Sequence, residues 1–171
     1  MILLRFLKRM NDWQEKAIRL FAILICGIIV SALIVSALTR YLSGTGYDWF
    51  IELPPALIPW IVFPLLGPIF RSGAHIKVDL LMNFLTKSQI LFMELLVCVV
   101  VLVGAGMFFM AGIEAVELFK RLGQLMELEI EIPIWWMYLA FPVGFAILIS
   151  FVVEMILEKF SELYQLSTSS K

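Results

Sequence analysis

The chain has 171 residues, of which 62% are hydrophobic and 16% are charged. Soluble globular domains have about 45–50% apolar and about 25% charged residues, so this composition excludes an ordinary water-soluble domain and favours a lipid environment. The net charge of −1 is not accompanied by a basic face, and we therefore expect no nucleic-acid partner.

The N-terminal part of the chain contains two predicted elements. Residues 1–16 mix basic and apolar side chains, which predicts an amphipathic helix on the membrane surface. Residues 17–38 carry no charge after Arg19 and are long enough to cross a hydrocarbon core of about 30 Å. Because this apolar run is longer than the core of a signal peptide, we predict a first transmembrane helix that is retained, with Arg40 at its far interface.

The second predicted span, residues 53–70, is shorter and rich in proline. Each proline inside a helix removes a backbone donor and clashes with the preceding turn, so we expect a kinked helix with protein neighbours. The prolines are Pro54, Pro55, Pro59, Pro64 and Pro68.

The third predicted span, residues 88–113, is interrupted only by Glu94 and continues as a helix to about residue 125. Polar residues recur there at steps of three and four, which places them on one helix face. The fourth span, residues 132–157, opens with Pro133 and an aromatic belt that includes Trp135. The tail, residues 167–171, is predicted to be disordered.

The distribution of Lys and Arg predicts the orientation. Ten lie in the N-terminal segment, the loop of residues 71–87 and the tail, against three on the opposite side. The more basic side faces the cytoplasm, so both chain ends are predicted to lie inside. The predicted fold is an all-α integral membrane protein with four transmembrane helices.

Candidate catalytic groups are scarce. His75 is the only histidine, which excludes haem held by a histidine pair and zinc or di-iron sites that need several histidines. The sequence shows no hydrolase spacing either. We therefore predict no enzymatic activity, no catalytic or metal-binding residues and no cofactor.

Two polar features leave alternatives open. Glu94, about a quarter to a third of the way into its span, is either a proton or ion site or a carboxylate paired with Lys or Arg near the inner surface. Arg71, His75 and Asp79 recur every four residues in the inner loop and would share one face of a helix. There Arg71 would pair with Asp79 or cap the second helix, and a solvated turn is the other possibility.

Several motifs together resemble the small membrane subunit of TRAP transporters, the tripartite ATP-independent periplasmic carriers. The matching residues span about residues 40–144 in family-like order. They are Arg40-Tyr41, Trp49, Glu52, Trp60, Gly67, Arg71, Gly73, His75-Ile76-x-Val78-Asp79, Ile132-Pro133-x-Trp135, Tyr138 and Pro142-x-Gly144. The chain departs from the family in its many helix-two prolines and in having Thr86-Lys87 where a proline often closes the motif loop.

The resemblance implies a division of labour in a bacterial inner membrane. A periplasmic binding protein delivers an organic acid, such as sialic acid or a C4-dicarboxylate, to a large membrane subunit of about 12 helices that imports it with sodium. The small subunit would be a scaffold for the large one and a docking aid for the binding protein, with no substrate site of its own. Arg40, Trp49, Glu52 and Trp135 would then face the periplasmic partner. Arg71, Gly73, His75 and Asp79 would stabilise the inner loop or the subunit contact.

Two other functions are compatible with parts of the sequence. A small oligomeric exporter or ion carrier would use Glu94 from several copies. A membrane anchor for a redox enzyme would need a cofactor that the chain has no residues to ligate.

Overall fold

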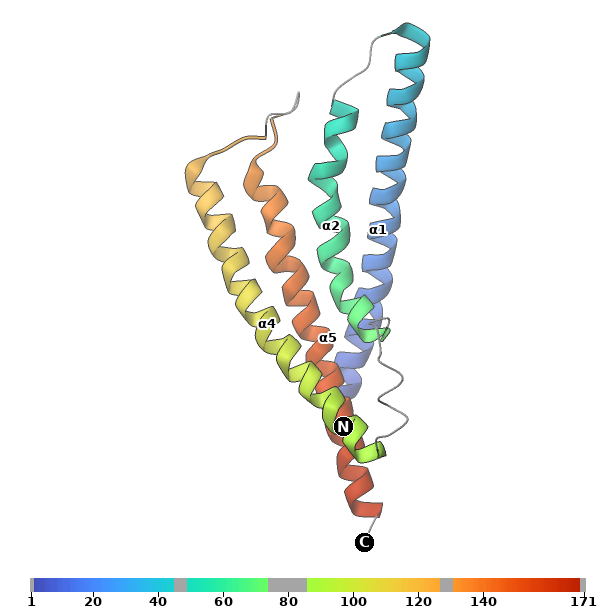
Figure 1. Ribbon diagram of the computed structural model, residues 1–171, viewed down its shortest axis with the longest axis vertical. Coiled ribbons are helices and arrows are strands. Elements are labelled where there is room, and N and C mark those ends of the chain that lie inside the picture. The colour runs from blue at the N-terminus through green and yellow to red at the C-terminus, as the bar shows by residue number, and fades with distance from the viewer. Residues whose placement is uncertain (1, 45–48, 74–85, 127–130, 170–171) are drawn as a thin grey trace.

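The computed structural model describes residues 2–44, 49–73, 86–126 and 131–169, and they form four long α-helices. In chain order these are α1 (Ile2–Ser43), α2 (Trp49–Arg71), α4 (Lys87–Leu122) and α5 (Ile134–Ser169). All four are long and apolar enough to cross a membrane, which confirms the predicted number of spans. Both chain ends lie toward the same end of the molecule (Figure 1), as four crossings require.

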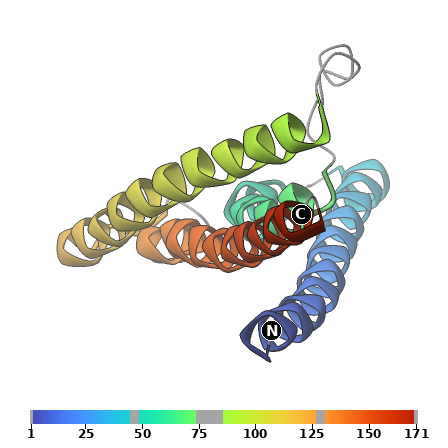
Figure 2. The ribbon, with the colours of Figure 1, turned by 90° about the horizontal axis from the view of Figure 1, so that it is seen from below.

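The helices stand in a row in the order α4, α5, α2, α1 (Figures 1 and 2). Helix α5 packs along both α4 and α2, and α1 packs mainly on α2 while also contacting α5. A row leaves more apolar surface uncovered than a closed bundle. Exposed side chains on the edge helices include Leu24 (57%), Val100 (64%) and Phe108 (56%). These faces require lipid or another protein as a neighbour.

Charged residues mark where each helix enters the bilayer. Each helix contains an uncharged stretch of 18–20 residues, about 27–30 Å long, which matches the hydrocarbon thickness. These stretches are residues 20–39, 53–70, 95–113 and 134–153. We call the side with the chain ends the inner side. Beyond these uncharged stretches, α1 and α5 continue well past the inner edge of the hydrocarbon layer, and α4 continues past its outer edge.

The core lies between α2, α4 and α5. A cluster of buried residues from these helices consists of Phe70, Cys98, Ala105, Leu148 and Val152. Cys98 is buried in this cluster, and Cys26 is exposed on α1.

Two glycines allow α2 and α5 to approach closely. A Cβ on Gly144 would overlap the backbone of Phe63, and one on Gly67 would lie 2.8 Å from a ring carbon of Phe151. Contact between helix backbones at small residues is the usual means of association in lipid. Gly104 and Gly106 of α4 differ, because apart from the local backbone of α4 no atom of the described chain lies within 4 Å of a Cβ built on either.

Three helices, α1, α2 and α5, continue beyond the bounds of the predicted spans. Residues 2–43 form one continuous helix, so the predicted surface helix is the beginning of the first spanning helix. Helix α2 remains a single α-helix across its five prolines. It lies between α1 and α5, in agreement with the expectation that a proline-rich helix has protein neighbours.

The helix ends have identifiable local causes. Thr86 precedes α4 as its N-cap, and the Gln89 side chain accepts a hydrogen bond from the Thr86 backbone N–H at 2.9 Å. Thr86, where the sequence departs from the family pattern, is therefore the residue that caps the start of α4. Helix α4 stops at Gly123, whose φ of 61° is left-handed and easily adopted by glycine.

The last helix continues through Ser169, so it includes most of the tail that the sequence assigns to disorder. Elongating a formed helix costs little compared with starting one, which explains why weak helix formers are carried along at its end. Residues 170–171 lie outside the described residues.

Candidate functional site

Polar side chains from three helices meet at the inner boundary. We call this group the inner polar cluster. It comprises Asn11, Asp12 and Glu15 of α1, Arg71 of α2, and Ser150 and Glu154 of α5.

Arg71 is the centre of the inner polar cluster. It is the last residue of α2, and the chain turns away after it through Gly73, whose φ is 63°. Its Nη2 lies 2.6 Å from Asp12 Oδ1 and 3.1 Å from Glu154 Oε1, and its Nη1 lies 3.3 Å from Glu15 Oε2. A single guanidinium thus joins α1, α2 and α5.

Glu154 is fully buried, as is Asn11. Its Oε2 accepts a hydrogen bond from Asn11 Nδ2 at 2.6 Å, and the Ser150 hydroxyl donates to Asn11 Oδ1 at 2.8 Å. Its Oε1 makes no hydrogen bond, so its contact with Arg71 is purely an ion pair. A buried carboxylate is tolerated only when it is paired, and these contacts provide the pairing.

A second ion pair joins α4 to α5. Glu94 Oε2 lies 2.7 Å from Lys159 Nζ, which is also 3.8 Å from Glu162 Oε2. Lys159 follows Glu154 by five residues, about 7.5 Å further inward along α5. We infer that Glu94 lies at the inner membrane surface and not within the span, in the paired state that was one of its two predicted alternatives.

A third contact fixes the inner end of α1. Lys8 Nζ lies 2.9 Å from Glu158 Oε1, on the next turn of α5 after Glu154. This pair forms because the continuous α1 brings the N-terminal segment beside α5.

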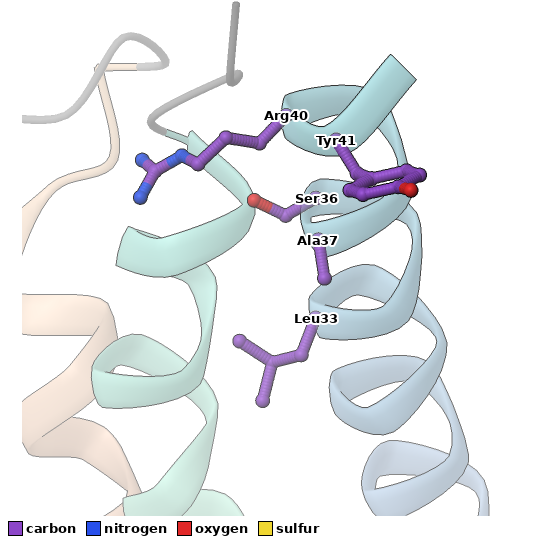
Figure 3. Close-up of a pocket in the computed structure, with 5 residues that line it drawn as sticks. All are labelled: Leu33, Ser36, Ala37, Arg40 and Tyr41. Carbon is purple, nitrogen blue, oxygen red and sulfur yellow. The ribbon is translucent and has the colours of Figure 1, made fainter. Parts of the chain in front are cut away.

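At the outer end, Arg40 borders a groove on α1 of about 440 Å³ (Figure 3). The groove is lined by Leu33, Ser36, Ala37, Arg40 and Tyr41. Figure 3 shows the Arg40 side chain extending toward α2 while the Tyr41 ring points away from it. Within the described part of the chain, Arg40 has no ion-pair partner.

The other predicted outer residues are distributed along the same end of the molecule. Trp49 begins α2, although its side chain is outside the described part, and Glu52 lies in the first turn of that helix. Lys120 Nζ of α4 lies 5.7 Å from the centre of the Trp135 ring of α5. These residues line one end of the molecule and do not form a single pocket.

Two residues of the predicted inner motif, His75 and Asp79, lie outside the described residues. The expected contact between Arg71 and Asp79 therefore remains a prediction. The described contacts of Arg71 are with α1 and α5, and sequence reasoning missed these partners. A signal was present, because Ser150, Glu154 and Glu158 repeat every four residues on one face of a helix that is otherwise apolar.

Comparison with known families gives the chain its identity. Residues 29–162, well over half of the sequence, match the family described as "Tripartite ATP-independent periplasmic transporters, DctQ component". The chain belongs to the DctQ family. No curated protein and no solved structure matches it.

Membership of the DctQ family confirms the resemblance seen in the sequence motifs. This DctQ protein is a multi-pass membrane component of a TRAP transporter, a tripartite system that also contains a larger membrane component and a periplasmic binding component. DctQ is a transporter component and not a known enzyme family.

Proposed function

We propose that this DctQ protein is a non-catalytic scaffold in a bacterial inner membrane. It holds the large TRAP subunit in place and helps to seat the periplasmic binding protein, while the large subunit imports an organic acid with sodium. The family assignment supports the transporter, and the arrangement of charges supports the scaffold role.

The positions of the charged residues are the main support for this proposal. A carrier binds its substrate or coupling ion near the membrane midplane, through polar groups or broken helices. The four uncharged stretches contain no Asp, Glu, Lys, Arg or His. The inner polar cluster joins helices at one boundary, which suits a rigid brace better than a transport path.

The row of helices supports a role in binding another membrane protein. Its edge helices, α1 and α4, present apolar faces, and around Gly104 and Gly106 the described chain leaves open space. A partner helix can approach closely at such glycines. We assign one of these faces to the large subunit and leave the remaining apolar surface to lipid.

The outer end offers groups suited to docking. Arg40 lacks an ion-pair partner in the described chain, and the outer segments of the sequence are acidic, with seven Asp and Glu against three Lys and Arg. The acids are Asp48, Glu52, Glu114, Glu117, Glu127, Glu129 and Glu131. Charges of this kind steer a soluble partner toward its site. The substrate and sodium contacts belong to the other subunits in this proposal.

Co-purification and reconstitution test the scaffold role. We expect the tagged chain to retain the large subunit of its own operon in mild detergent, and liposomes with the tagged chain alone to show no uptake. Liposomes with both membrane subunits and the binding protein should take up substrate. Uptake by the tagged chain alone would contradict the proposal, and so would a complex that assembles and transports equally well without it.

The alternative of an oligomeric exporter rests on Glu94. In the structure this carboxylate is paired with Lys159 of the same chain, which leaves no need for a second copy. The scaffold proposal is therefore the better supported of the two.

A further inference from the structure

The inner half of α1 has two faces with different partners. One face carries Asn11, Glu15 and the buried Ile18, and it packs on α2 and α5. The opposite face is exposed along its whole length. At about 100° per residue, six side chains fall within an arc of about 100° on this exposed side. We call it the basic aromatic face, and its members are Arg5, Phe6, Arg9, Trp13, Lys16 and Leu20.

The cations of the basic aromatic face are not neutralised by the described chain. Arg5, Arg9 and Lys16 take part in none of its ion pairs. The two acids of this half of α1, Asp12 and Glu15, are both held by Arg71. Three positive charges are therefore available to an external partner.

The large apolar members of the same face are also uncovered. Phe6 is 64% exposed, Trp13 is 74% exposed and Leu20 is 60% exposed. Basic residues next to the cytoplasmic end of a spanning helix attract anionic headgroups, and apolar side chains beside them contact the adjoining acyl chains. Tryptophan in particular is enriched at that depth.

Contacts of α2 give the depth of this face. Arg71, where α2 leaves the bilayer, touches Asp12 and Glu15, so Trp13 and Lys16 lie at the same level. Arg5 lies two further turns inward, about 12 Å along the axis from Trp13. One headgroup layer is about 5–8 Å thick, so Trp13, Lys16 and Arg9 lie within it on the inner side, and Arg5 lies just beyond it.

We propose that the basic aromatic face of α1 binds anionic phospholipid headgroups of the inner leaflet. Lys16 and Arg9 contact the phosphates and Arg5 adds positive charge just beyond them. Trp13 lies among the headgroups, and Leu20, at the start of the uncharged stretch, enters the adjoining acyl region. The lipid thereby holds the edge helix of the row on the side away from α2. This interaction is additional to subunit assembly and does not depend on it.

Lipid selection by the full-length chain tests the proposal. The chain is placed in nanodiscs of equal parts phosphatidylglycerol and phosphatidylcholine, extracted in detergent, and analysed for retained lipid by mass spectrometry. We expect the wild type to retain phosphatidylglycerol preferentially. The triple variant R5Q/R9Q/K16Q should lose that preference by about tenfold or more.

Matched variants separate this face from a general charge effect. Lys8→Gln removes a cation from the same segment, but this side chain lies outside the basic aromatic face and pairs with Glu158 of α5, so the preference should remain. The charge-conserving variant R5K/R9K/K16R should also retain it.

Four results would overturn the proposal. They are equal retention of both lipids by the wild type, an unchanged preference in the triple variant, an equal loss in Lys8→Gln, and a loss in the charge-conserving variant. A triple variant that keeps its lipid preference but no longer co-purifies with the large subunit would assign the face to that protein.

Discussion

Arg71 balances three carboxylates at the inner boundary, and Glu154 is buried beneath it. Replacing Arg71 with Met leaves that carboxylate without its counter-ion, which in a buried pair costs about 3 kcal/mol. We therefore expect Arg71→Met to lower the thermal stability of the purified chain in detergent, measured by circular dichroism. The control is Arg121→Met, which breaks an exposed ion pair with Glu117 and should cost well under 1 kcal/mol.

A second substitution identifies the cause of that loss. If the penalty comes from an unpaired buried charge, Glu154→Gln in the Arg71→Met background should restore part of the stability, because the amide carries no charge. A double variant that is less stable than Arg71→Met alone would contradict this explanation, because the amide oxygen of Gln can still accept the hydrogen bond from Asn11.

Glu94 distinguishes the scaffold from the exporter. Its pair with Lys159 is partly exposed, with 31% and 25% of the two side chains accessible. Such pairs contribute at most about 1 kcal/mol, so Glu94→Gln should reduce stability slightly and leave uptake by the complete transporter near the wild-type level. Substrate uptake into proteoliposomes measures this. Abolished uptake with intact assembly would favour a transport role for the carboxylate.

At the scale of elements, hydropathy predicted the four spans because each uncharged stretch is as long as the bilayer is thick. The lengths of the helices were harder to predict, because a helix need not stop where the membrane does. Between residues 2 and 26 the sequence contains no glycine or proline, so nothing breaks α1 at the boundary. The charged residues show where α1 leaves the lipid, but the helix itself continues past that position.

The inner polar cluster could be predicted only in part. Arg71 stood out as a charged residue at the end of a span, but its partners belong to two other helices. Periodicity assigns Asn11 and Glu154 to polar positions on their own helices and cannot show that these positions meet. That information lies in the packing of α1 against α2 and α5.

The contact between α2 and α5 depends on Gly144. Because a Cβ there would overlap the backbone of Phe63, Gly144→Ala forces the helices apart. Overpacking of this kind costs about 1–3 kcal/mol, and thermal unfolding in detergent measures it.

Gly27→Ala is the matched control, since no atom of the described chain lies within 4 Å of a Cβ at that position of α1. Alanine is favoured over glycine inside a helix by about 0.5–1 kcal/mol, so this variant should be as stable as the wild type or slightly more so. Equal destabilisation by both substitutions would show that the close approach of α2 and α5 is not what limits stability.

At the scale of the whole molecule, the row of helices resembles one layer of a larger membrane assembly more than a closed domain (Figure 2). The inner boundary is fixed by ion pairs between α1, α2 and α5 and between α4 and α5. The faces of the two edge helices are apolar and uncovered within the chain. A scaffold with these properties would widen the membrane-embedded part of the complex, while its own helices keep a fixed order.

The orientation of this row decides whether Arg40 and Trp135 can reach a periplasmic protein at all. Ten Lys and Arg residues on the side of the chain ends, against three on the other, predict that both ends are cytoplasmic.

Single cysteines in a Cys26→Ser and Cys98→Ala background test this orientation by their reaction with a membrane-impermeant maleimide. Gln124→Cys, exposed beyond the outer end of α4, should react in intact cells. Glu162→Cys, exposed on the inner extension of α5, should react only after permeabilisation. The reverse pattern would place the basic aromatic face outside and remove Arg40 from any periplasmic partner, so this labelling tests the docking role and the lipid proposal together.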